Sequence, residues 1–359
     1  MALPTSDDSH TLSGIQQLGI GVPDMDSAWQ WYRESFGVDV PVLIDAAEAP
    51  DMVDYTGNEV QSRRAVLAIN LQGGGGFEVW QYTSRTPQPP NFQVSLGDYG
   101  ILVGKMKCRS AESARRHLVD LGRSVLSDVV PDLEGVPHFY VLDPFDNIFE
   151  IIESDEFFGN TSSKVAGVVG AAIGVSDMEA AVTFYRRVLG YDQILADDTG
   201  VFQDLSKLPG GQSKLRRVVL THSERRAGPF SRLFGPSSIE LIQNTEGEGR
   251  RVFSDRYWGD LGFIHLCFDV VGMDSLKIQC EHLGHPFVVD SKDSFDMGDA
   301  AGRFSYIEDP DGTLIEFVET HRIPIAKKMG IYLDLRKRNR GEPLPNWMLK
   351  SLRFARVKR

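Results

Sequence analysis

The sequence predicts an α+β protein of four βαβββ units, arranged as two tandem modules whose curved sheets form half-open barrels with the helices outside. Two internal repeats lead to this prediction. The segment IGVPDMDSAWQWYRESFGVD (20–39) resembles IGVSDMEAAVTFYRRVLGYD (173–192), and YVLDPFDNIFEIIE (140–153) resembles YIEDPDGTLIEFVE (306–319). One helix among several strands, repeated four times, is typical of curved mixed sheets covered by helices.

Each copy of the first repeat predicts a strand followed by an amphipathic helix. Asp24 and Asp177 stand where a helix N-cap is expected, and Gly37 and Gly190 follow the last helical turn. The same strand, helix and Leu-Gly order recurs at 100–125 and 265–287, so each module divides into two units.

The last strand of every unit carries a glutamate among apolar residues. These strands are expected at 76–83, 147–153, 237–244 and 313–319, and their glutamates are Glu78, Glu150, Glu240 and Glu316. Side chains alternate across a strand, so each glutamate faces away from the side that packs against helices. An ionised carboxylate in a dry cavity is costly unless it has a partner, a metal or water.

The repeats also predict the domain boundaries. We expect a flexible N-terminus over 1–11, a first module over 12–156, a polar linker over 157–167, a second module over 168–321 and a basic tail over 322–359. The tail holds 12 Lys and Arg against two acids, on a chain whose net charge is −12. We expect it to dock on the acidic body, the alternative being an anionic membrane surface or a partner.

Length, charge and cysteine spacing limit the classes of protein to which this chain can belong. With 359 residues, 42% of them apolar, the chain is long enough for a large core, and its net charge of −12 argues against nucleic-acid binding. The first residues lack the basic and apolar regions of a signal peptide, and no apolar run is long enough for a membrane helix. The three cysteines are widely spaced, which favours a cytoplasmic location.

The repeated units resemble the vicinal oxygen chelate superfamily, which includes glyoxalase I, methylmalonyl-CoA epimerase, extradiol ring-cleaving dioxygenases and bleomycin resistance proteins. The resemblance covers about 12–321 and is carried by the strand–Asp–helix–FY–LG opening and the DPDGxxIE ending. It implies that two units pair into each half-open barrel. It also implies that metal ligands come from the first and last strands of the paired units.

Eight positions in this sequence correspond to such ligands. The first strands offer Gln17, Val103, Gly170 and His265, and the last strands offer the four glutamates. Units 1 and 4 together hold Gln17, Glu78, His265 and Glu316, a set similar to that of glyoxalase I. If units pair in order, both sites are incomplete. We therefore predict that unit 1 pairs with unit 4, with one divalent metal per chain, and that Glu150 and Glu240 face solvent.

The resemblance implies a glyoxalase-like, metal-dependent isomerase or lyase. The reaction would abstract a proton next to a metal-chelated carbonyl and pass through an enediolate, with Glu316 and Glu78 as acid and base candidates. Nickel, zinc or cobalt would be the metal, and the substrate a small molecule with adjacent oxygens. Glutathione-dependent glyoxalases carry an arginine and an asparagine where this chain has Gly21 and Tyr82, so glutathione is not the expected cosubstrate.

Three alternatives stay open at this point. Trp80 and Tyr82 share the face of Glu78, so they either contact an apolar or aromatic substrate or simply fill the barrel. The chain could instead be an iron(II) ring-cleaving dioxygenase, although that chemistry usually needs two histidines and one carboxylate. It could also be a non-enzymatic resistance-type protein that binds a small molecule without metal.

Overall fold

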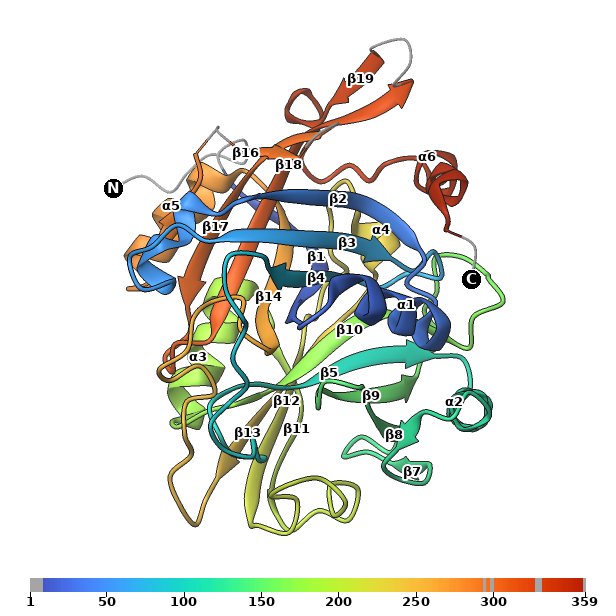
Figure 1. Cartoon of the computed structure of the whole chain (residues 1–359), viewed down its shortest axis with the longest axis vertical. Coiled ribbons are helices and arrows are strands. Elements are labelled where there is room, and N and C mark those ends of the chain that lie inside the picture. Colours follow the sequence, from blue (N-terminus) through green and yellow to red (C-terminus); the bar gives the residue numbers. More distant parts are fainter. Residues whose placement is uncertain (1–8, 293–294, 298–299, 327–330, 358–359) are drawn as a thin grey trace.

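In the computed structural model, which describes residues 9–292, 295–297, 300–326 and 331–357, the chain forms two mixed sheets with helices packed against them (Figure 1). One sheet has ten strands and the other nine, and they lie one above the other in the view of Figure 1. The predicted α+β class with strand-rich tandem units is confirmed.

The first two units follow the predicted order of elements. Unit 1 comprises β1 (Thr11–Gly21), α1 (Met25–Phe36), β2 (Val40–Glu48), the 3-10 helix η1 (Pro50–Tyr55), β3 (Ser62–Ile69) and β4 (Gly76–Tyr82). Unit 2 comprises β5 (Gly100–Cys108), α2 (Ala111–Asp120), β6 (Ser124–Val125), β7 (Val130–Pro131), β8 (Pro137–Leu142) and β9 (Ile148–Glu153).

The last two units repeat this order with additions. Unit 3 comprises β10 (Val165–Gly174), α3 (Met178–Leu189), β11 (Gln193–Gly200), β12 (Leu215–Thr221), α4 (Ser231–Phe234) and β13 (Ser238–Asn244). Unit 4 comprises β14 (Gly262–Val271), α5 (Met273–His282), β15 (Val289–Asp290), β16 (Phe295–Met297), β17 (Ala300–Glu308) and β18 (Leu314–Ala326). The tail adds β19 (Ile331–Asp334), the 3-10 helix η3 (Leu335–Lys337), α6 (Asn346–Ser351) and the 3-10 helix η4 (Leu352–Ala355).

The sheet order confirms that unit 1 pairs with unit 4. The ten-stranded sheet runs β15-β17-β18-β14-β1-β4-β3-β2, with β16 also paired to β17 and β19 also paired to β18. Strand β1 joins β14 in antiparallel register. The nine-stranded sheet runs β11-β12-β13-β10-β5-β9-β8-β6, with β7 also paired to β8, so units 2 and 3 form the other half of the molecule. Each sheet therefore contains strands from both halves of the chain.

The predicted helix ends are confirmed by their hydrogen bonds. The Asp24 carboxylate accepts from Ser27 N at 2.8 Å, and that of Asp177 accepts from Ala180 N at 3.0 Å. Gly37 and Gly190 close α1 and α3 with φ of 66° and 69°, a conformation that costs glycine little.

The aspartates of the second repeat anchor these helices. Tyr32 on α1 donates to Asp143 at 2.6 Å, and Tyr185 on α3 donates to Asp309 at 3.0 Å. Both aspartates also accept backbone N–H groups of their own turns, as at Thr313 N. The repeated motif thus ties the helix of one unit to the last hairpin of the next.

The C-terminal tail packs on the body, as predicted. Leu344 and Leu349 are buried in an apolar cluster with Val40 and Phe234. Arg356 pairs with Asp39 at 3.0 Å. Within the described part of the chain, none of the helices has the length and apolarity that a membrane crossing requires.

Candidate metal centre

Four predicted side chains meet at the middle of the ten-stranded sheet. Gln17 on β1, Glu78 on β4, His265 on β14 and Glu316 on β18 come from four adjacent strands. His265 Nε2 lies 3.1 Å from Glu316 Oε2 and 3.3 Å from Glu78 Oε2. Gln17 Nε2 donates to Glu316 Oε2 at 3.2 Å. The ligand atoms of Glu78, His265 and Glu316 all lie within 4.8 Å of one another.

Gly19 provides the space for the imidazole ring. It pairs with His265 on one side and with Glu78 on the other, so it lies between the two ligand strands. A Cβ at this position would lie 2.5 Å from Cε1 and 2.6 Å from Nε2 of His265. Only glycine therefore lets the ring lie across β1 toward the carboxylates.

Burial and charge act in opposite directions on this group. His265 is fully buried and Glu316 is 6% exposed. Burial disfavours the imidazolium, but the Glu316 and Glu78 carboxylates outweigh it and raise the pKa of His265 to about 10. Burial also disfavours ionised Glu78, but its hydrogen bond and charge interaction with His265 lower the pKa of that carboxyl overall. Two carboxylates beside one imidazolium thus leave the group with a net negative charge.

The donor set fits a divalent metal ion. Gln17 Oε1 is buried and has no hydrogen-bond partner among the described residues. Such an orphaned acceptor costs free energy unless something else binds it. Two carboxylate oxygens, one amide oxygen and one imidazole nitrogen suit zinc, nickel, cobalt or manganese. The residues present could therefore hold one ion between β1, β4, β14 and β18.

Aromatic side chains enclose the four polar residues. Trp258, from the loop before β14, lies nearly parallel to the His265 ring at 6.4 Å, and Tyr306 on β17 lies edge-on at 5.5 Å. Trp80 packs against Trp258 at 4.6 Å. Trp80 and Tyr82 are 1% and 3% exposed, so both contribute to the packed wall around the site.

The same loop occupies the space beside Gly21. A Cβ on Gly21 would overlap the backbone carbonyl of Asp260, so no larger residue fits there with this backbone. The Tyr82 hydroxyl donates to the Trp258 carbonyl. Gly21 and Tyr82 are the two positions at which the sequence departs from glutathione-dependent glyoxalases. Residues 258–260 therefore cover both of them.

The prediction for Glu150 and Glu240 is wrong, because both are buried rather than facing solvent. Lys105 Nζ bridges them at 2.8 Å and 2.6 Å, and Arg217 binds Glu240 at 2.6 Å. His138 Nδ1 lies 2.6 Å from Glu150 Oε1. Side-chain cations thus neutralise the two glutamates inside the nine-stranded sheet.

Sequence analysis missed several of these neighbours for identifiable reasons. Lys105 stands two residues after Val103, so strand parity alone could have placed its ammonium on the inner face. Tyr306 could have been found in the same way on its own strand. No sequence signal marks Trp258, because it comes from an irregular loop.

Comparison with known proteins agrees with this architecture. Residues 167–317 match the family described as the Glyoxalase/Bleomycin resistance protein/Dioxygenase superfamily. Among solved structures, glyoxalase I from Zea mays is 14% identical with a TM-score of 0.53, over 87% of this chain and 93% of that one. A putative dioxygenase from Bacillus subtilis subsp. subtilis str. 168 is also 14% identical with a TM-score of 0.53, over 97% of each chain. No curated protein matches the sequence.

Proposed function

Because residues 167–317 match the Glyoxalase/Bleomycin resistance protein/Dioxygenase superfamily, we propose that this chain is a metal-dependent isomerase or lyase that moves a proton next to a substrate carbonyl. Support comes from one observation above all: Gln17, Glu78, His265 and Glu316 converge from four strands although they span most of the sequence. A divalent ion held there would polarise a carbonyl oxygen and acidify the adjacent C–H bond.

Within this proposal the two glutamates have different roles. Glu316 accepts a hydrogen bond from Gln17 and its side chain is 8% exposed, which favours a fixed ligand. The Glu78 side chain is 21% exposed, so it is the better placed to reach a substrate. We assign Glu78 the task of removing the proton and returning it.

The surroundings favour an aromatic or apolar substrate without glutathione. Trp80, Trp258 and Tyr306 lie around the site and would exclude water from the reacting atoms. The indole N–H groups of Trp80 and Trp258 are buried and have no partner among the described residues. They would serve as hydrogen-bond donors to substrate oxygens. At position 21, where glutathione-dependent glyoxalases carry an arginine, a larger side chain would overlap the Asp260 backbone.

The test combines metal content with proton exchange. Untagged protein is analysed for divalent metals by mass spectrometry, beside Glu316→Ala and His265→Ala. Protein loaded with nickel, zinc, cobalt or manganese is then incubated in D2O with phenylglyoxal hemithioacetals and with aromatic α-hydroxyketones. Deuterium incorporation at the carbon next to the carbonyl is followed by NMR.

The proposal expects about one metal per chain, lost in both variants, and deuterium incorporation that Glu78→Gln abolishes while the protein still binds metal. Iron with oxygen-dependent cleavage of catechol would instead support the ring-cleaving dioxygenase. Protein without metal above background, and with unchanged variants, would overturn the metalloenzyme proposal in favour of a binding protein.

A further inference from the structure

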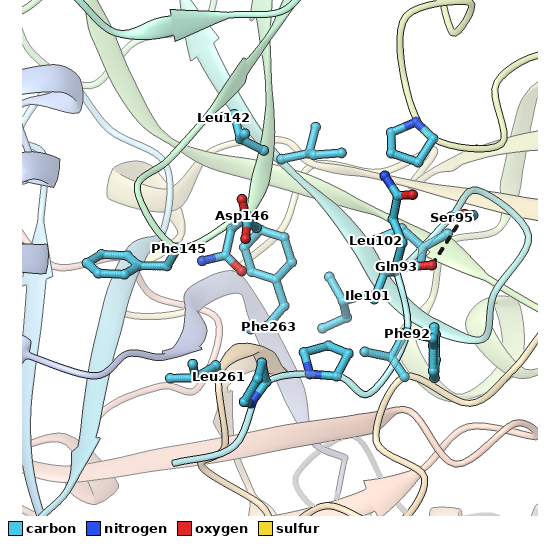
Figure 2. Close-up of a pocket in the computed structure, with 18 of the residues that line it drawn as sticks. Phe92, Gln93, Ser95, Ile101, Leu102, Leu142, Phe145, Asp146, Leu261 and Phe263 are labelled. Carbon is cyan, nitrogen blue, oxygen red and sulfur yellow. Dashed lines mark hydrogen bonds between the residues drawn. The ribbon is translucent and has the colours of Figure 1, made fainter. Parts of the chain in front are cut away.

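A large apolar cavity lies away from the four candidate ligands. It measures about 750 Å³, and Figure 2 shows Phe92, Phe145 and Phe263 among its walls. We call it the phenylalanine cavity. The loop 89–96, the start of β5, the β8–β9 turn and the start of β14 form it, so both sheets contribute. None of Gln17, Glu78, His265 or Glu316 lines it.

We propose that the phenylalanine cavity binds an uncharged, largely apolar small molecule as a non-catalytic ligand. This goes beyond the proposed function, because none of the four candidate metal ligands lines the cavity. Its volume lies within the range of about 300–1,000 Å³ that is usual for small-molecule sites.

The interior beneath the cavity supports binding rather than catalysis. Leu102 and Ile148 line the cavity and pack in a cluster that includes Tyr140. The Tyr140 ring lies 5.1 Å from the ring of His138, which contacts Glu150. Beyond this layer, Lys105 and the two glutamates are at most 5% exposed and bound to one another. The acidic groups are thus sealed and offer no free base to a ligand.

The lining determines the chemistry of the ligand. Apart from Asp146 and Lys207, the lining residues carry no ionisable side chain, and these two are exposed and opposite in charge. A strongly charged ligand therefore gains little there. Gln93 and Asn147 also line the cavity, and their amide groups could orient a single polar group. An aromatic or branched hydrocarbon skeleton with one polar atom fits this lining.

The outer wall is held in place by both halves of the chain. Leu96 N donates to Pro209 O at 2.8 Å, and Gln88 N donates to Asp260 Oδ1 at 2.8 Å. Arg250 donates to Gln93 O at 3.1 Å and places its guanidinium 3.8 Å from the Phe92 ring. The loop 89–96 is therefore fixed over the cavity, and the cavity is formed before a ligand arrives.

The experiment uses N-phenyl-1-naphthylamine, an uncharged aromatic probe that fluoresces in apolar surroundings. We expect saturable binding of one probe per chain, and a melting temperature that rises with probe concentration. Val94→Trp and Leu142→Trp fill the cavity and should each weaken binding at least ten-fold. Ile278→Trp on α5, whose side chain is 56% exposed, is the matched control and should bind the probe unchanged.

Two further results separate this site from the metal centre. His265→Ala and chelator-treated protein should bind the probe with the same affinity as the untreated chain. Non-saturable fluorescence, or equal affinity in the cavity variants and Ile278→Trp, would overturn the proposal by showing surface adsorption. Loss of probe binding in His265→Ala would also overturn it, because the probe would then bind at the metal centre.

Discussion

Gln17 and Glu316 are 299 positions apart in the sequence, yet Gln17 Nε2 donates a hydrogen bond to Glu316 Oε2 at 3.2 Å. Gln17 Oε1 is buried, and no hydrogen-bond partner for it is found among the described residues. The amide therefore orients one candidate ligand while offering its own oxygen as another.

Gln17→Leu should weaken metal binding by about ten-fold or more, because it removes both a ligand and the hydrogen bond to Glu316. The measurement is competition with a fluorescent zinc chelator. Gln16→Leu is the matched control, since Gln16 is the adjacent residue and its Oε1 lies 3.8 Å from Cys267 Sγ instead. Equal losses in the two variants would show that Gln17 has no special role.

Gly19→Ala should disturb the centre without altering any ligand. The new Cβ would lie 2.5–2.8 Å from three atoms of the His265 ring, so the ring or the strand must move. We expect a changed cobalt(II) absorption spectrum and a destabilisation of about 1–3 kcal/mol. Gly200→Ala serves as the control, because its Cβ would meet no atom within 4 Å. An unchanged spectrum in Gly19→Ala would contradict the assignment of His265 as a ligand.

Lys105→Met should destabilise the fold strongly. It removes the ammonium group between Glu150 and Glu240, which are 1% and 2% exposed. Removing one partner of a buried ion pair costs about 3–5 kcal/mol. Urea unfolding of Lys105→Met should therefore occur at a clearly lower midpoint.

The matched control is the exposed pair of Arg225 and Glu156, whose side chains are 86% and 48% exposed. Arg225→Met should change stability by less than about 1 kcal/mol. Similar midpoints for the two variants would mean that solvent reaches the network around Lys105.

Asp269→Asn should change how stability depends on pH. Burial raises the pKa of Asp269 from its usual value to about 7. The folded state therefore binds this proton more tightly than the unfolded state, and the resulting stability is present below about pH 4 and lost as the pH rises to 7. Asparagine cannot ionise, so the variant should gain stability relative to the unchanged protein over this interval.

The measurement is urea unfolding of both proteins at pH 5 and pH 8. Asp198→Asn on exposed β11 is the surface control and should follow the unchanged protein at both pH values. The raised pKa of Asp269 would be refuted if the two proteins differed in unfolding free energy by the same amount at pH 5 and at pH 8.

Deleting residues 341–359 should expose the apolar surface that Leu344 and Leu349 cover. We expect a lower melting temperature and aggregation on size-exclusion chromatography. Trp347→Ser and Phe354→Ser, at positions 65% and 80% exposed, are the controls and should leave both readouts unchanged. A monomeric, equally stable deletion variant would show that docking of the tail contributes nothing.

Much of the fold could be predicted because helix caps, helix ends and strand alternation depend on residues that are close in the sequence. The caps at Asp24 and Asp177 and the closing glycines lie within one turn of the helices they bound. Strand alternation alone predicts that each candidate ligand faces away from the side of its strand that packs against helices. These ligands are Gln17, Glu78, His265 and Glu316. The pairing of units 1 and 4 followed from ligand chemistry, since only that pairing brings an amide and an imidazole to two carboxylates.

The sequence by itself determined the repeats, the elements and the side chains able to meet at the ten-stranded sheet, because these depend on neighbouring residues and strand parity. Only the tertiary structure determined that Glu150 and Glu240 are buried and paired with side-chain cations. Lys105 on β5 reaches Glu150 on the adjacent β9, and Arg217 on β12 reaches Glu240 on the adjacent β13. The ion pair between Lys105 and Glu240 forms only after β5 and β10 pair. Such neutralisation depends on distances of a few ångströms between segments far apart in the chain, which local patterns do not encode.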